Sequence, residues 1–76
     1  MRPETLHYLA VQCVALGKRM TAIELAHMDS ACQFDNAVAE AQYCRLGGIR
    51  SDIELACCRT MEEAEAFCKF KAQVAR

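Results

Sequence analysis

The residues of this chain that could carry chemistry are six cysteines, two histidines and a run of glutamates. Cysteine and histidine together can form a nucleophilic pair or bind a metal ion, and paired carboxylates can act as general acid and base. His7 and His27 both lie on helical patterns, and neither stands near a serine and an aspartate suited to a catalytic triad. Glu62, Glu63 and Glu65 are typical of the solvated first turn of a helix. We therefore predict no catalytic residue and a protein that is not an enzyme.

The even number of cysteines permits a complete disulfide framework. Nine residues separate Cys58 from Cys68, and eleven separate Cys32 from Cys44. This spacing resembles that of the twin-cysteine helical hairpins of the mitochondrial intermembrane space, with a loop at Gly47-Gly48. The nine-residue gap that this family repeats occurs once here, and two cysteines are left over. A disulfide-linked hairpin is thus one open alternative.

A second alternative is a metal site built on the adjacent residues Cys57 and Cys58. The further ligands available to it are His27, Cys32 and Cys44. The chain has no Cys-x-x-Cys pair, and adjacent cysteines rarely bind one zinc ion together. We therefore predict no metal and no cofactor, and reduced thiols buried at the core positions of helices.

The N-terminal segment matches a secretory signal poorly. Glu4 and His7 disturb the basic start of such a signal, and Gln12 interrupts the apolar stretch from Tyr8 to Leu16. No apolar run approaches the ~20 residues that cross a bilayer. We expect a cytoplasmic protein with reduced cysteines and no membrane association.

Length and composition predict a single small helical domain over residues 1–76. Thirteen of the 76 residues are alanine and ten are β-branched, so helices should dominate. Small side chains bury little area and a domain of this size is marginally stable, so we expect a homodimer or a partner protein. The net charge of −1 lacks the basic character of most nucleic-acid-binding domains.

Helical signals divide the chain into segments. Apolar spacing predicts a first helix from Pro3 that ends at Gly17. Residues 21–24, Thr-Ala-Ile-Glu, form a capping box that should open a short second helix. A third helix should run from about Cys32 to Leu46 and end at Gly47-Gly48.

Beyond the glycines, residues 49–57 suit either a short strand or a helix. Residues 60–63, Thr-Met-Glu-Glu, form a better capping box, and an amphipathic helix follows over about residues 60–75. The predicted fold class is therefore mainly α. It comprises a helix-turn-helix core over about residues 21–46, a possible short β wing and a C-terminal amphipathic helix.

Four short stretches carry a family resemblance. They are Tyr8-Leu9-Ala10-Val11, Met20-Thr21 through Leu25-Ala26, Ala37-Val38-x-x-Ala41-x-Tyr43, and Ile53-Glu54-Leu55. Over Leu6 to Cys57 the chain resembles the CaiF/GrlA family of enterobacterial transcriptional activators. The resemblance implies a winged helix-turn-helix fold and a role in regulating transcription initiation. The chain departs from the family by one inserted residue between the motif helices and by an acidic helix in place of a longer basic region.

Seven polar and basic residues are the candidate contacts to DNA. They are Gln33, Asn36, Gln42, Arg45, Arg50, Lys18 and Arg19. Amide side chains near the start of a recognition helix can read adenine edges, and arginines can hold phosphates. Asp35 and Glu40 would face the polyanion and weaken its binding. Under this interpretation duplex DNA is a partner.

The alternative is a contact with another protein through adaptable apolar side chains, for which Met61, Phe67 and Phe70 are the candidates. The function predicted first is a small transcriptional regulator that acts on DNA directly or through a partner. The alternative function is a small helical inhibitor or adaptor of the phage or plasmid type, which binds another protein and does not contact DNA.

Overall fold

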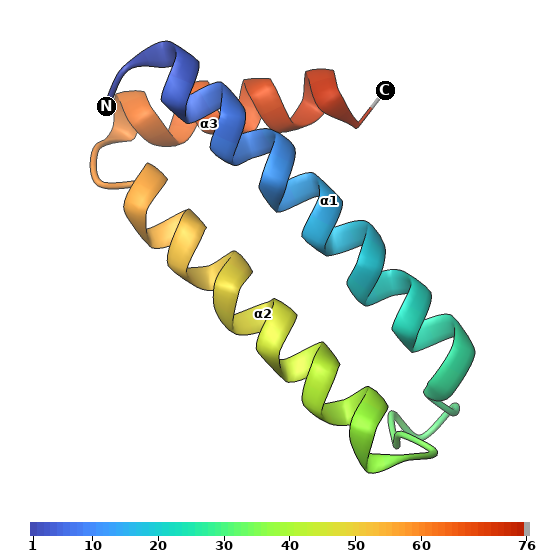
Figure 1. The fold of residues 1–76 in the computed structure, drawn as a ribbon. Coiled ribbons are helices and arrows are strands. Elements are labelled where there is room, and N and C mark those ends of the chain that lie inside the picture. The colour runs from blue at the N-terminus through green and yellow to red at the C-terminus, as the bar shows by residue number, and fades with distance from the viewer. Residues whose placement is uncertain (76) are drawn as a thin grey trace.

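Three helices make up the structure, a computed structural model that describes residues 1–75. They are α1 (Pro3–His27), α2 (Ala37–Cys57) and α3 (Met61–Val74). The helices α1 and α2 lie side by side as an antiparallel hairpin, and α3 lies across its open end (Figure 1). α1 packs against both other helices, whereas α2 and α3 touch each other little. The predicted mainly α class is confirmed, and no helix of this part of the chain is long and apolar enough to cross a membrane.

The helix α1 continues through the point where the sequence predicts its end. Gly17 lies inside it, and the hydroxyl of Thr21 donates a 3.0 Å hydrogen bond to the Gly17 carbonyl. This bond is typical of a threonine in a helix interior, so the predicted capping box and short second helix are wrong. Leu16 before the glycine and Met20 and Ile23 after it are half-buried, so the apolar stripe continues past the glycine. Their packing outweighs the cost of about 1 kcal/mol that glycine adds inside a helix.

A loop over residues 28–36 joins α1 to α2. Within it the Asp29 carboxylate accepts two backbone amide hydrogen bonds, which close a tight turn. Asn36 then caps α2 by accepting a 2.7 Å hydrogen bond from the amide three residues on. This cap sets the start of the helix at Ala37, later than the predicted Cys32.

The two consecutive glycines lie inside α2 rather than at its end. Gly47 faces α1, because a Cβ added there would lie 3.3 Å from the Met20 Cε atom. The glycine therefore permits close approach of the two helices. Residues 49–57 are helical, so the possible β wing is wrong.

The region predicted as a helix-turn-helix core, residues 21–46, is the closed end of the hairpin (Figure 1). The helices of a helix-turn-helix cross at about 90–120°, whereas α1 and α2 run alongside each other. Residues 1–75 contain an isolated bridge between Met28 and Phe34 but no β-strand. The predicted winged helix-turn-helix is thus corrected to a helical hairpin with a third helix across its open end.

The main core lies where all three helices meet. Its buried residues are Leu6, Ala10, Cys13, Cys57 and Phe67. Phe67 is the largest of them and is only 1% exposed. Farther along the hairpin the buried side chains are Ala39 and Leu46. The core is therefore concentrated at the open end.

The helix α3 is the amphipathic helix that the sequence predicts over about residues 60–75. Thr60 caps it by accepting a 3.1 Å hydrogen bond from the amide of Glu63. The Glu63 carboxylate does not return to Thr60 but lies 3.3 Å from the amino group of Met1. The cap is therefore correct as predicted, and its acidic residue ties α3 to the start of the chain.

The molecule is elongated and exposes a large surface. Its principal extents are 41 × 23 × 18 Å and its accessible surface is 5474 Å². A compact monomer of 8.5 kDa exposes about 4,700 Å². Much of each helix in the hairpin therefore faces solvent.

Candidate functional site

A groove of about 400 Å³ lies between α1 and α2. Its lining residues are Arg19, Ile23, Gln42, Arg45, Leu46 and Ile49. Positions three or four residues apart lie on the same side of a helix, so each helix contributes one strip of its surface. The antiparallel hairpin brings the two strips together.

The groove has an apolar floor and a cationic rim. Leu46 is buried, Ile23 is half-buried and Ile49 is 43% exposed. Arg19 and Arg45 are exposed, and neither forms an ion pair with another of the described residues. Guanidinium groups bind carboxylates and phosphates through paired hydrogen bonds. The groove can therefore hold an acidic ligand that also carries apolar groups.

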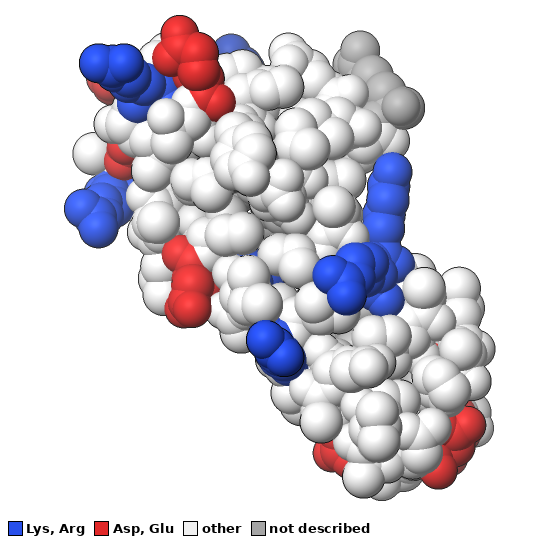
Figure 2. Space-filling model, viewed as in Figure 1, with Lys and Arg blue, Asp and Glu red and all other residues white. Residues whose placement is uncertain are grey.

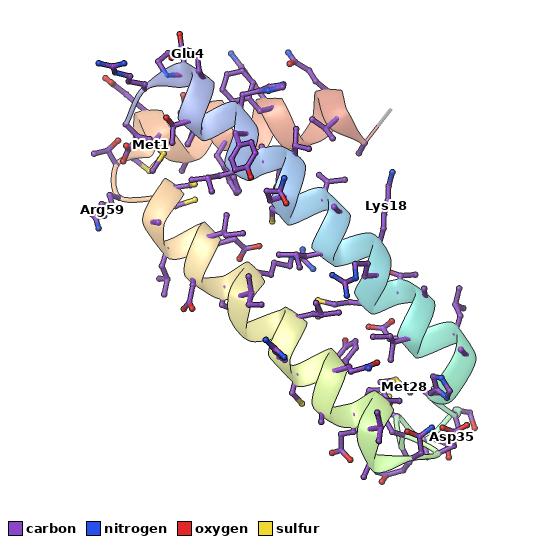
Figure 3. All side chains as sticks on the ribbon, viewed as in Figure 1. Met1, Glu4, Lys18, Met28, Asp35 and Arg59 are labelled. Atoms are coloured by element: carbon purple, nitrogen blue, oxygen red, sulfur yellow. The ribbon has the colours of Figure 1, made fainter. Side chains whose placement is uncertain are left out.

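The positive charge is unevenly distributed over the hairpin. Figure 2 shows blue side chains gathered across the middle of one face, over α1 and α2, and red side chains over the loop at the lower end. Lys18 extends from α1 on the side away from α2 (Figure 3), next in sequence to the groove residue Arg19. The net charge of −1 thus conceals a cationic middle and an acidic tip.

Arg50 is held within the hairpin. Its guanidinium lies against α1, where a Cβ added to Gly17 would be 3.7 Å from Nη1. Its buried Nε atom has no hydrogen-bond partner among residues 1–75 but lies 3.3 Å from the Glu54 carboxylate. The same carboxylate receives a 3.8 Å contact from the Cys13 thiol. Arg50 therefore links α2 to α1 and is less accessible than the two groove arginines.

Gln33 and Asn36, predicted to read bases, lie in the loop at the closed end of the hairpin. Asn36 is engaged as the cap of α2, and its amide nitrogen lies 3.1 Å from a carboxylate oxygen of Asp35. Asp35 also lies 2.9 Å from the ring of His27. The two amide residues do not line the groove. The structure therefore separates them from the arginines with which the sequence groups them.

Of the seven residues predicted to contact DNA, Arg19, Gln42 and Arg45 share the groove. The apolar residues that line the groove, Ile23, Leu46 and Ile49, are not predicted as site residues from the sequence. Each of them lies four positions from a polar lining residue on the same helix. The pattern is hidden in the sequence because the predicted break between Gly17 and Thr21 separates Arg19 from Ile23, and the predicted helix end at Gly47-Gly48 separates Leu46 from Ile49.

Tyr43 and Glu24 connect the two helices nearer the closed end. The Tyr43 hydroxyl donates a hydrogen bond to the Glu24 carboxylate, and the Phe34 ring centre lies 5.2 Å from that of Tyr43. The bond raises the pKa of Tyr43, because loss of the phenol proton would place two negative charges together. This contact is a polar link within the fold.

The predicted partner-binding residues do not form one surface. Phe67 is buried in the core, so its prediction as a contact is wrong. Phe70 is half-buried and meets the His7 ring edge-on at 5.1 Å. Met61 is 77% exposed. A chain with few large side chains requires its aromatic residues in the core, which leaves little of this set on the surface.

All six cysteines are free. Cys13 and Cys57 are buried, and burial raises the pKa of the Cys57 thiol. The exposed ones are Cys32, Cys44, Cys58 and Cys68, so the expectation that the thiols are core atoms is wrong for these four. Within the described part of the chain no three His, Cys, Asp or Glu side chains are grouped to hold a metal ion.

Comparison of the chain with protein-family models, with curated proteins and with solved structures finds no significant match. The resemblance to the CaiF/GrlA family therefore stays a prediction. The wing that the resemblance implies is replaced by the second half of α2. The groove and the charged side chains around it are therefore the features that indicate a function.

Proposed function

We propose that this protein is a small helical protein-binding module, an inhibitor or adaptor, whose α1–α2 groove holds an acidic, amphipathic segment of another protein. The observation that carries the proposal is the groove itself. Two arginines without an ion pair inside residues 1–75 flank an apolar floor. A segment that combines carboxylates with apolar side chains complements both parts of this surface.

The composition of the groove favours a protein ligand over duplex DNA. An apolar floor has no counterpart in a sugar–phosphate backbone, whose binding depends on cations. The acidic loop at the closed end would repel a polyanion that extended along the hairpin (Figure 2). For this role we also propose a cytoplasmic location, where free thiols stay reduced.

Peptide display on the immobilised protein tests this function. A random library should yield peptides that combine Asp or Glu with apolar residues, and fluorescence anisotropy then gives the Kd of a selected peptide. Arg19→Glu and Arg45→Glu should each raise that Kd at least about tenfold, because repulsion replaces attraction at the rim.

Arg59→Glu is the matched control. It makes the same change of charge at an exposed arginine in the link between α2 and α3, away from the groove (Figure 3). The Kd of the peptide should stay within about twofold of the wild-type value. An equal loss of affinity in all three variants, or a library without acidic binders, would contradict the proposal.

A transcriptional regulator that contacts duplex DNA is the second candidate, favoured by the cationic middle of the hairpin (Figure 2). Contacts from Lys18, Arg19 and Arg45 to three phosphates would lower log K with log salt at a slope of about −3. Anisotropy of a labelled duplex at several salt concentrations measures this slope. If micromolar protein shows no binding at low salt, direct DNA contact is excluded.

A further inference from the structure

The groove between α1 and α2 offers few partners for the backbone of a bound peptide. Its walls are side chains of two helices, whose own amide and carbonyl groups are hydrogen-bonded within each helix. Of the lining side chains, that of Gln42 alone contains a hydrogen-bond acceptor. An extended peptide would therefore leave most of its buried amide groups unpaired, which costs free energy. A helical peptide pairs these groups within itself.

Other modes of peptide recognition need features that the groove lacks. Addition of a strand requires an exposed sheet edge, and residues 1–75 contain no β-strand. A polyproline segment requires aromatic side chains, and none lines the groove. Arginines alone can hold an acidic motif, but the apolar floor would then stay in contact with water. A helix that lies in the groove uses both the floor and the rim.

The open end of the hairpin already packs a third helix. There α3 lies across α1 and α2 and contributes Phe67 to the main core (Figure 1). Beyond α3 the hairpin has two helices, and its buried side chains are Ala39 and Leu46. The groove floor beside Leu46 includes Ile49, which is 43% exposed. Within residues 1–75 the middle of the hairpin thus lacks the apolar cover that α3 gives to its end.

We propose that the acidic segment binds in the groove as an amphipathic α-helix, which lies along the hairpin and forms a third helix over its middle. This inference rests on the proposed function and specifies the class of partner. The partner carries a helical motif whose apolar strip contacts Ile23, Leu46 and Ile49. Carboxylates on the two sides of that strip face Arg19 and Arg45.

The length of the groove fits a helix of two turns or more. On α2 the lining residues run from Gln42 to Ile49, a rise of about 10 Å along the helix axis. Two turns of a bound helix rise by about the same distance. The partner motif therefore needs at least two turns that present apolar side chains on one face.

The two arginines lie close to the same level of the hairpin. A Cβ added to Gly47 would contact Met20, so in the antiparallel pair Arg19 lies level with Gly48. Arg45 is three residues before Gly48 and therefore lies about 4.5 Å nearer the closed end. One helical turn rises about 5.4 Å. Two carboxylates within one turn of the bound helix, one on each side of its apolar strip, can therefore meet both arginines.

Two peptide libraries of equal composition test the conformation of the ligand. Both combine Asp or Glu with apolar residues over about 14 positions, which is four helical turns. One library is closed by a hydrocarbon cross-link between positions i and i+4, which favours a helix, and the other carries a central proline, which disfavours one. Selection on the immobilised full chain should enrich binders from the cross-linked library.

Variants of the protein and of a selected peptide then identify the site and the bound conformation. Arg19→Glu and Arg45→Glu should each raise the peptide Kd at least about tenfold, and the control Arg59→Glu should leave it within about twofold. In the linear peptide, proline at a central solvent-facing position should raise the Kd at least about 100-fold, whereas glutamine there should change it less than about twofold. The Cα chemical shifts of the ¹³C-labelled peptide should become helical on binding.

The outcomes separate this inference from the function on which it rests. Groove binders that come equally from both libraries, or from the proline library alone, would overturn the helical ligand and leave the proposed function intact. A groove-bound peptide without helical chemical shifts would do the same. Absence of binders from both libraries, or a Kd that neither groove arginine affects, would overturn both the helical ligand and the proposed function.

Discussion

The open and closed ends of the hairpin are stabilised in different ways. At the open end three helices enclose Phe67 and the apolar residues around it. At the closed end the buried side chain is the small Ala39, and the Tyr43 hydroxyl of α2 forms a hydrogen bond with the Glu24 carboxylate of α1. The groove lies between these two helices and away from the three-helix core. Binding surfaces are often drawn from such less stable parts of a structure.

Removal of a phenylalanine from each end gives the largest expected difference. Phe67→Ala should lower the free energy of unfolding by about 3–5 kcal/mol, because it leaves a cavity in the main core. A small domain has about 5 kcal/mol in total, so this variant should be largely unfolded. Phe34→Ala, at a half-buried position near the closed end, should cost less than half as much. Urea denaturation followed by circular dichroism measures the free energy of unfolding of both variants. Equal losses in the two would mean that the two ends contribute equally to stability.

The rates at which the cysteines react with a thiol reagent should distinguish the three-helix core from the exposed surface. Cys13 and Cys57 lie in the main core, where the surrounding side chains keep a reagent from reaching the sulfur atoms until the core opens. Under native conditions these two should react with N-ethylmaleimide on the order of 100-fold more slowly than the four exposed cysteines. Mass spectrometry of the time course should show four rapid additions and two slow ones. Six additions at one rate would contradict the buried core.

Local signals in the sequence predict the elements whose ends are set locally. Thr60 follows the end of α2 at Cys57, so no helix continues through it and its cap forms as the pattern indicates. Thr21 has the same type of pattern, but packing of α1 against α2 keeps it inside a helix. The glycine signals fail for the same reason. Their cost of about 1 kcal/mol each is smaller than the gain from continuous packing between the two long helices.

The candidate site depends on contacts between distant segments, and the sequence predicts only part of it. Charge alone identifies Arg19 and Arg45 as candidates, but their common groove requires the antiparallel pairing of α1 with α2. Ile49 is predicted to start a wing because the preceding glycines suggest a break. Gln33 is predicted to be helical because the helix is taken to begin soon after Asp29-Ser30, whereas Asn36, another residue type that favours the N-cap, sets the start of α2.

Substitutions at the two central glycines of α2 separate the effect of helix–helix packing from that of intrinsic helix propensity. Gly48→Ala should raise the free energy of unfolding of the monomer by about 0.5–1 kcal/mol, since the added methyl meets no atom within 4 Å. Gly47→Ala should gain less, because its methyl would lie 3.3 Å from the Met20 Cε atom and must displace it. Urea denaturation followed by circular dichroism gives both values. A larger gain at Gly47 would show that the helices are not in close contact there.

The hydrogen bond between Tyr43 and Glu24 should contribute least to the free energy of unfolding. It can be recognised because its contribution depends on pH. The hydrogen bond to Glu24 holds the pKa of Tyr43 above its ordinary value of 10.0. The native state therefore favours the protonated phenol, so the stabilisation from this link is present below pH 10.0 and is lost as pH rises through the raised pKa. Glu24→Gln should lower the pKa of Tyr43 towards 10.0.

Tyrosinate absorbance measures this shift in a Tyr8→Phe background, where Tyr43 is the remaining tyrosine of the two. If Tyr43 titrates at the same pH in this background with and without the Glu24→Gln substitution, the phenol and the carboxylate are not in contact in solution. The closed end would then lack its side-chain hydrogen bond between α1 and α2, and its difference in stability from the three-helix core would be greater than the structure indicates.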